Sequence, residues 1–168
     1  MSRSVTAKAK HITKKYENTT RKKEKNKVQQ KEREEMDEVN VSIEAEVNPT
    51  ESEEKVKKAI ENIFGNIPMH VKPIYKGHQI TAQTNSIEPL TRFYNVLRRE
   101  RIRAAARAVL FEGLSGNTIN FYLNKQVAFA GHVSFSKAIA ESPLGPIKVT
   151  IKCQNPRQLI GWLIPRTF

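Results

Sequence analysis

The uneven placement of charged and apolar residues limits where this chain can fold. Residues 1–35 carry 12 Lys and Arg against 5 Glu, with very few apolar side chains among them. Such a segment cannot bury enough surface to build a core, so we expect it to be disordered, or a solvated helix that orders on a partner. We therefore predict a basic N-terminal extension, 1–35, followed by one domain of ordinary size, 36–168.

Charge is also unevenly divided within the domain. Residues 36–65 hold 8 acidic and 3 basic side chains, whereas residues 66–168 hold 14 basic and 4 acidic ones. A basic arm beside a domain with a basic region is typical of a protein that binds a polyanion, and RNA is the partner we predict. Two alternatives for the extension stay open. In the first, the extension is a solubilising tail without a target. In the second, it is an upstream addition to a reading frame that starts at Met36.

Hydrophobic periodicity predicts a strand and a helix at the start of the domain. Apolar and polar side chains alternate over residues 39–47, which is typical of a strand with one buried face. Thr50 followed three residues later by Glu53 forms a capping box, so Thr50 is expected to cap a helix that ends near Gly65.

Two weaker strand segments and a long helix follow. Residues 71–75 and 80–84 are either one irregular strand or two short strands joined by a bend. Ser86 is the expected N-cap of a helical region that runs to Gly113. The predicted apolar face of this helix consists of Leu90, Phe93, Leu97, Ala104, Ala108 and Phe111.

Three strands and a short helix are predicted for the rest of the chain. The strands are expected at residues 119–123, 127–135 and 147–153, and the helix at residues 155–163. The resulting order is β-α-β-α-β-β-β-α. Paired strands late in the chain favour an α+β fold, with a largely antiparallel sheet covered by helices on one face.

An arginine-rich segment is the clearest local sign of phosphate binding. Residues 98–103 read Arg-Arg-Glu-Arg-Ile-Arg. On a continuous helix Arg99, Arg103 and Arg107 share one stripe, and Arg92 lies two turns earlier, close to the same line. Phosphates would relieve the repulsion among these cations, because a guanidinium grips two phosphate oxygens at once. The alternative is an exposed face that pairs with acidic residues elsewhere in the fold.

The predicted RNA-binding set joins these arginines to other cations. It comprises Arg92, Arg98, Arg99, Arg101, Arg103, Arg107 and Lys125 of the domain, and Lys14, Lys15, Arg21, Lys22 and Lys23 of the extension. Lysines beside strands also simply protect sheet edges from aggregation, which is the alternative for Lys125. Tyr75, Tyr94 and Tyr122 can stack on unpaired bases where they are exposed, although tyrosine more often packs in a core.

The sequence contains no pattern typical of a catalytic or metal site. The four histidines lack the spacing and the acidic or thiol neighbours of metal ligands, and the glycines form no phosphate-binding loop. The acids at Glu51, Glu53 and Glu54 lie in a predicted first helical turn, where the helix dipole favours negative charge. We therefore predict a protein that is not an enzyme and needs no cofactor.

Cysteine usage and hydropathy bear on location. The single cysteine, Cys153, has no partner within the chain and is expected to be a half-buried strand residue. No apolar run has the length of a signal peptide core or a membrane span. A soluble, cytoplasmic protein without a membrane partner is expected.

Several segments resemble a known family. They are residues 41–51, residues 121–126, residues 141–147 and the Trp162-Leu163-Ile164-Pro165 ending. Together they resemble a small archaeal family labelled RNA-binding or exosome-subunit-like, and the resemblance covers about residues 39–166. It implies a fold similar to that of the ribosomal protein that binds 5S ribosomal RNA. It does not extend to the N-terminal extension.

These observations lead to one hypothesis and one alternative. The hypothesis is a non-enzymatic RNA-binding protein that contacts structured RNA, associated with the ribosome or with RNA processing, through its basic arm and arginine-rich helix. Ribosomal or RNA-processing proteins are then further expected partners. The alternative is a protein-interaction adaptor that docks a larger assembly through its acidic helix or a sheet edge.

Overall fold

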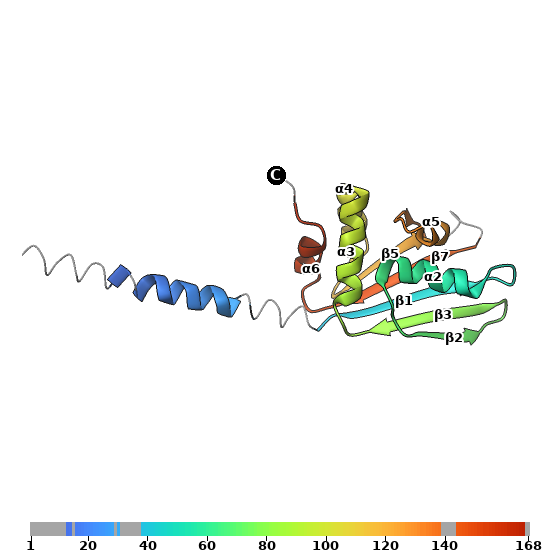
Figure 1. The fold of residues 1–168 in the computed structure, drawn as a ribbon, viewed down its shortest axis with the longest axis horizontal. Coiled ribbons are helices and arrows are strands. Elements are labelled where there is room, and N and C mark those ends of the chain that lie inside the picture. The colour runs from blue at the N-terminus through green and yellow to red at the C-terminus, as the bar shows by residue number, and fades with distance from the viewer. Residues whose placement is uncertain (1–12, 15, 29, 31–37, 139–143, 167–168) are drawn as a thin grey trace, which may run out of the picture. The chain divides into compact units, whose positions relative to one another are not determined.

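The computed structural model describes residues 13–14, 16–28, 30, 38–138 and 144–166 (Figure 1). The chain divides into two units, residues 1–35 and 36–168. The elements of the second unit are β1 (Asn40–Val47), α2 (Glu53–Phe64), β2 (Met69–Pro73), β3 (His78–Thr84), α3 (Glu88–Glu100), α4 (Arg103–Glu112), β4 (Leu114–Ser115), β5 (Thr118–Asn124), α5 (Lys125–Phe129), β6 (Phe135–Ser136), β7 (Pro146–Lys152) and α6 (Pro156–Leu163).

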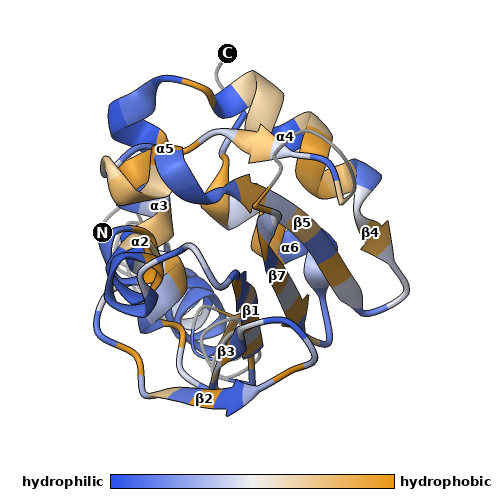
Figure 2. Cartoon of the chain, turned by 90° about the vertical axis from the view of Figure 1, so that its right-hand side faces the viewer, coloured by the Kyte–Doolittle hydropathy of each residue, from blue (hydrophilic) through white to orange (hydrophobic). Residues whose placement is uncertain are grey.

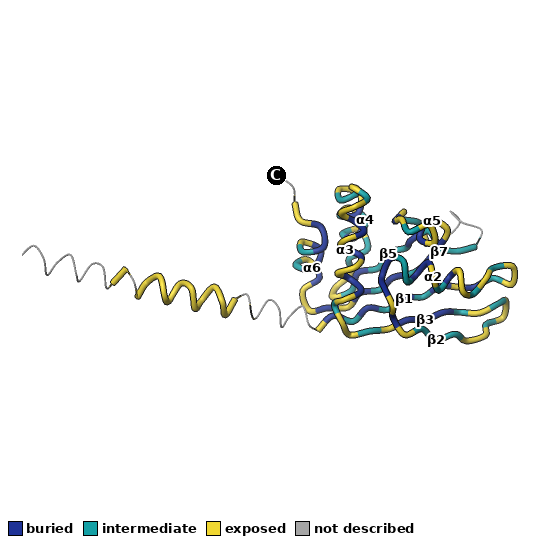
Figure 3. Tube along the Cα trace, viewed as in Figure 1, coloured by how far each residue is buried: buried dark blue, intermediate teal, exposed yellow. Residues whose placement is uncertain are grey.

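The described residues of the first unit are helical and exposed throughout (Figure 3). Among these described residues the large apolar side chains, Tyr16 and Val28, are 71% and 55% exposed. A helix that buries no face of its own gains nothing from tertiary packing, so its stability depends on local propensity or on a partner. The described part of the extension thus adopts the solvated helix, one of the two states that its composition predicts.

The second unit is built on one antiparallel sheet. Its described strands run in the order β2-β3-β1-β7-β5-β4, with β6 paired to β5, and every neighbouring pair is antiparallel. The helices lie on one side of this sheet (Figure 1). The predicted α+β class, with an antiparallel sheet covered by helices, is confirmed, and residues 69–84 form the two short strands of one predicted alternative.

The alternation of apolar and polar side chains along the strands determines which face of the sheet the helices cover. In β1 the side chains of Val41, Ile43, Ala45 and Val47 are buried, and the residues between them are half-buried or exposed. β5 and β7 repeat this pattern, which Figure 2 shows as alternating hydropathy. A period of two places all the apolar residues of a strand on one face, so the opposite face of the sheet is polar.

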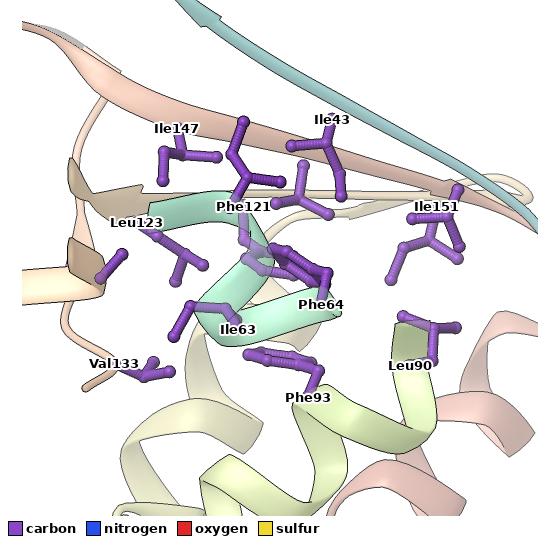
Figure 4. Close-up of a cluster of buried hydrophobic side chains, with 14 of the residues drawn as sticks. Ile43, Ile63, Phe64, Leu90, Phe93, Phe121, Leu123, Val133, Ile147 and Ile151 are labelled. Carbon is purple, nitrogen blue, oxygen red and sulfur yellow. The ribbon is translucent and has the colours of Figure 1, made fainter. Parts of the chain in front are cut away.

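Three phenylalanines join the helical layer to the sheet (Figure 4). Phe93 of α3 lies 5.6 Å from Phe64 of α2 and 5.4 Å from Phe121 of β5, measured between ring centroids. All three side chains are almost completely buried. Each such ring contributes about 1.5–3 kcal/mol through burial, and each pair adds roughly 0.5–1.5 kcal/mol. This cluster fixes α3, and with it the arginines that α3 carries.

The start of α2 differs from the prediction. Ser52 is the N-cap, and its hydroxyl accepts a hydrogen bond from the Lys55 backbone N–H at 3.4 Å. Thr50 therefore does not cap the helix. Glu51, the residue after Thr50, stabilises the preceding turn: its Oε2 accepts a hydrogen bond from the Asn48 backbone N–H at 2.8 Å.

The long helix predicted after Ser86 is broken in two. Arg101 adopts the left-handed conformation, with φ 57° and ψ 30°, and ends α3, and α4 begins at Arg103. The break changes which residues face the core. Ala106 and Leu110 are buried, whereas Ala104 and Ala108, assigned to the apolar face from the sequence, are exposed.

The predicted strand at residues 127–135 is also wrong. Asn124 ends β5 and caps the short helix α5, since its side-chain oxygen accepts a hydrogen bond from the Val127 backbone N–H at 3.0 Å. Of that segment only Phe135, together with Ser136 just beyond it, pairs with β5. The polar N-cap overrides the strand propensity of the apolar residues that follow it.

Candidate nucleic-acid interface

One guanidinium group is held on an aromatic stack that joins α3 to α6. Tyr94 of α3 stacks on Trp162 of α6, with ring centroids 5.5 Å apart and an interplanar angle of 16°. The Arg98 guanidinium carbon lies 5.4 Å from the Tyr94 ring centroid, and its Nη1 donates to the Tyr94 hydroxyl at 3.0 Å. Both rings are half-buried while Arg98 is exposed, so the stack supports a cation that faces solvent.

Two more guanidinium groups share a ring between α4 and α6. The guanidinium carbons of Arg107 and Arg157 lie 4.9 Å and 5.8 Å from the centroid of the Phe111 ring. Arg107 Nη1 also donates to the backbone oxygen of Ile164 at 2.9 Å. Arginine loses little conformational freedom on binding when a ring already fixes its planar head. We call the set Arg98, Arg107, Arg157, Tyr94, Phe111 and Trp162 the arginine–aromatic surface.

No carboxylate of the described residues forms an ion pair with the arginines of this surface. Across the part of the chain that the structure describes, no Asp or Glu oxygen lies within 4.0 Å of the charged nitrogens of Arg98, Arg107 or Arg157. The described ion pairs use Glu51, Glu53 and Glu100, each of which binds other cations. Three ordered guanidinium forks without acidic partners are suited to phosphate oxygens, which they can grip in pairs.

The arginine stripe predicted from the sequence does not form, because the break at Arg101 separates its members. Arg92 lies against Gly65 at the C-terminal end of α2, where a Cβ would come within 2.9 Å of its Nε. A cation at that position complements the negative end of the α2 dipole. Arg107 instead contacts Phe111 and Ile164. Arg92 and Arg107 therefore contact different parts of the domain and do not form one continuous stripe.

Arg99 also has a structural contact. It donates to the backbone oxygen of Gly131 at 2.6 Å, and its Nε lies 3.6 Å from Glu100. The Glu100 carboxylate lies 2.7 Å from His132 Nδ1, and this hydrogen bond is the main reason that the pKa of Glu100 is lowered. Arg101 is exposed and Arg103 half-buried. These two cations stay candidates for RNA contact.

Lys125 is buried and paired within the domain. Only 4% of the residue is exposed, and its Nζ donates to the Glu46 backbone oxygen at 2.6 Å and to both carboxylate oxygens of Glu51. This burial and pairing favour a structural role for Lys125 over the RNA contact predicted from the sequence. A buried ammonium group needs hydrogen-bonding or charged partners. The local sequence around Lys125 did not indicate these partners, because they come from distant segments of the chain.

The cations of the extension are accessible. Lys14, Arg21, Lys22 and Lys23 lie on the exposed helix of the first unit, and Lys15 lies outside the described residues. A helix of this composition presents charge on every side, which suits contact with a polyanion of variable geometry.

Metal ligands and membrane-spanning helices were also sought in the described residues. In this part of the chain no cluster of three or more His, Cys, Asp or Glu is arranged to hold a metal ion. Likewise, none of the described helices combines the length and the apolar character needed to cross a membrane. Cys153 is buried directly after β7, and burial raises the pKa of its thiol.

Comparison with known proteins identifies the family. The sequence model of a family described as RNA binding matches residues 40–153. A UPF0201 protein of Sulfurisphaera tokodaii is 44% identical over 127 residues, which cover 76% of this chain and 88% of that protein. The chain belongs to the UPF0201 family. The resemblance stated from the sequence is thereby confirmed.

Solved structures share the fold of this UPF0201 protein. A UPF0201 protein from Methanococcus jannaschii is 35% identical, with a TM-score of 0.67, and the match covers 75% of this chain and 99% of that one. A DUF54 protein from Methanothermobacter thermautotrophicus is 18% identical, with a TM-score of 0.55, and covers 74% and 96% of the two chains. At that identity the likeness shows the fold alone.

The family match and the arginine–aromatic surface overlap in part. Residues 40–153 include Arg98 and Arg107, but end before Arg157 and Trp162. From the sequence of this UPF0201 protein, Arg157 was only a cation that could widen the basic surface, and Trp162 was not placed in the RNA-binding set. Their role depends on α6 packing against α3 and α4, and a pattern within one segment does not show which distant segment it meets.

Proposed function

We propose that this UPF0201 protein is a non-enzymatic RNA-binding protein that contacts structured RNA of the ribosome or of RNA processing. The arginine–aromatic surface carries the proposal, because its three guanidinium groups are held by rings and have no described carboxylate partner. The family description, RNA binding, supports the same partner. In this account the basic extension adds affinity that is independent of sequence, through release of counterions.

Replacing two of these arginines tests the proposal. Arg98 and Arg157 are exposed, so Arg98→Glu with Arg157→Glu is expected to leave the fold intact. Loss of two phosphate contacts should weaken binding to a structured RNA at least about tenfold, and lower the slope of log affinity against log salt by roughly 2. Fluorescence anisotropy with a labelled RNA at several salt concentrations measures both quantities.

Two controls separate the geometry from the net charge. Arg98→Lys with Arg157→Lys keeps both charges but removes the planar forks, so its affinity should lie between those of the wild type and the double glutamate variant. Lys55→Glu with Lys58→Glu makes the same charge change on the exposed face of α2 and should have little effect. A folded Arg98→Glu/Arg157→Glu protein that binds as the wild type does would remove this surface from the binding site.

A groove between α2 and α5 favours an adaptor as the second candidate function. It encloses about 400 Å³, and its lining includes Val56, Ala59, Leu144 and Phe129, which is 45% exposed. An exposed aromatic beside an apolar groove is a common feature of protein-binding sites. This candidate predicts a stable complex with a partner protein that survives nuclease treatment, and loss of that complex in Phe129→Ala.

A further inference from the structure

The loop between β2 and β3 presents a tyrosine to solvent. The backbone N–H of Ile74 donates to the Gly77 oxygen at 3.2 Å, so Tyr75 and Lys76 occupy the middle of a tight turn. Tyr75 is 98% exposed, and among the described large hydrophobic side chains none is more exposed. A tyrosine that buries nothing contributes little to the fold.

The backbone beneath Tyr75 is held firmly. Gly77 has φ 89°, and a Cβ at that position would come within 2.0 Å of the Val47 backbone oxygen. The turn therefore packs closely on the end of β1, and only glycine fits there. An aromatic side chain on a fixed backbone loses little conformational entropy when a partner orders it, which favours a role in binding.

The hairpin that carries this turn is free of acidic residues. Residues 65–87 contain no Asp or Glu, and Lys72 and Lys76 are exposed. Of the acids on adjoining elements, Glu46 faces Gln79 across the β1–β3 pair. Glu53 forms an ion pair with Lys57 at 2.9 Å. The turn itself thus combines one exposed ring with cations, the pairing that proteins use on unpaired nucleotides.

We infer that the β2–β3 turn binds RNA by stacking Tyr75 on an unpaired base, while Lys72 and Lys76 contact the neighbouring phosphates. This inference rests on the proposed RNA-binding function, and it names unpaired nucleotides as the target of one contact. Bases in a duplex are already stacked on each other, so only a loop, bulge or strand end offers a free face. The turn lies at the end of the domain away from α6 (Figure 1), so it is a contact separate from the arginine–aromatic surface.

The test compares two RNAs and three variants of the full chain. One labelled RNA is a hairpin with an unpaired loop, and the other is a blunt duplex with the stem sequence. Tyr75→Ala should weaken binding to the hairpin about tenfold and leave duplex binding unchanged, as expected for the loss of one base–aromatic stack. Tyr75→Phe should bind both RNAs as the wild type does. Phe129→Ala removes another exposed ring and serves as the matched control.

The outcomes separate this inference from the proposed function. Equal binding of the hairpin by Tyr75→Ala and the wild type, while Arg98→Glu/Arg157→Glu weakens it, would overturn the stacking role of the turn alone. A loss of duplex binding in Tyr75→Ala equal to its loss of hairpin binding would also overturn it, since stacking needs an unpaired base. Failure of the wild type to bind either RNA would overturn the proposed function and, with it, this contact.

Discussion

At the scale of single residues, Lys125 shows how this basic protein uses one cation for its fold. Its ammonium group connects the start of α5 to the turn before α2, through Glu51 and the Glu46 backbone oxygen. Both side chains of the pair are mostly buried, with 4% and 11% of Lys125 and Glu51 exposed. Removing one partner would leave a charge without compensation, which costs more than the pair itself contributes.

Lys125→Met should therefore lower the free energy of unfolding by about 2 kcal/mol, measured by urea denaturation. Methionine keeps most of the apolar volume, so the loss reports on the unpaired Glu51 carboxylate. Lys125→Met combined with Glu51→Gln should recover part of this loss. Wild-type stability in the single variant would mean that the pair does not support the fold.

The same pair predicts a dependence of stability on pH. Burial raises the pKa of Glu51, but hydrogen bonds from the Asn48 backbone and the Lys125 ammonium outweigh it, so the pKa lies below its usual value of 4.5. A lowered pKa in the folded state stabilises the protein above the unfolded pKa, and this contribution is lost as the pH falls. Glu51→Gln should accordingly lose its stability deficit relative to the wild type between neutral pH and a pH below 4, as followed by thermal melts.

At the scale of secondary-structure elements, close backbone contacts fix how neighbouring strands meet. Gly77→Ala should destabilise the protein by about 2 kcal/mol or more, because the new methyl group meets the Val47 oxygen and the residue has φ 89°. Gly161→Ala in α6 meets nothing within 4 Å, and should be neutral or stabilising by up to about 1 kcal/mol. Equal melting temperatures for the two variants would contradict this account of the β2–β3 turn.

Elements with strong periodicity were predictable from the sequence. The strands at residues 40–47 and 146–152 follow an alternation of apolar and polar residues that is typical of a strand with one buried face. Helix α6 begins at Pro156, directly after the polar Asn155, and a proline in the first turn favours a helix start. The arginines at 98 and 107 were also identified from the sequence. Local patterns suffice where burial on one face determines the structure.

The remaining features depend on contacts between distant segments. No glycine or proline marks the break at Arg101 in the sequence. On a continuous helix Leu97 and Ala106 would lie on opposite faces, and the break allows both side chains to be buried in the same core. The burial of Lys125 depends on Glu51, a residue of another element. The rings under the arginines likewise come from helices far apart in the chain, so the surface is visible only in the folded protein.

At the scale of the whole molecule, two units are proposed to share one polyanion. The helical extension offers exposed cations on all sides, whereas the domain offers guanidinium groups in fixed positions. We propose that the first arrangement supplies affinity that depends steeply on salt, and that the second fixes the orientation of the protein on the RNA backbone. This proposal predicts that each unit contributes separately to the RNA affinity of the full chain.

The most direct test measures RNA affinity against salt concentration for the full chain and for residues 36–168 side by side. We predict that both bind a structured RNA and that the full chain shows the steeper slope, the difference giving the number of phosphates that the extension contacts. A domain that binds no RNA while the full chain binds would contradict the central role of the arginine–aromatic surface.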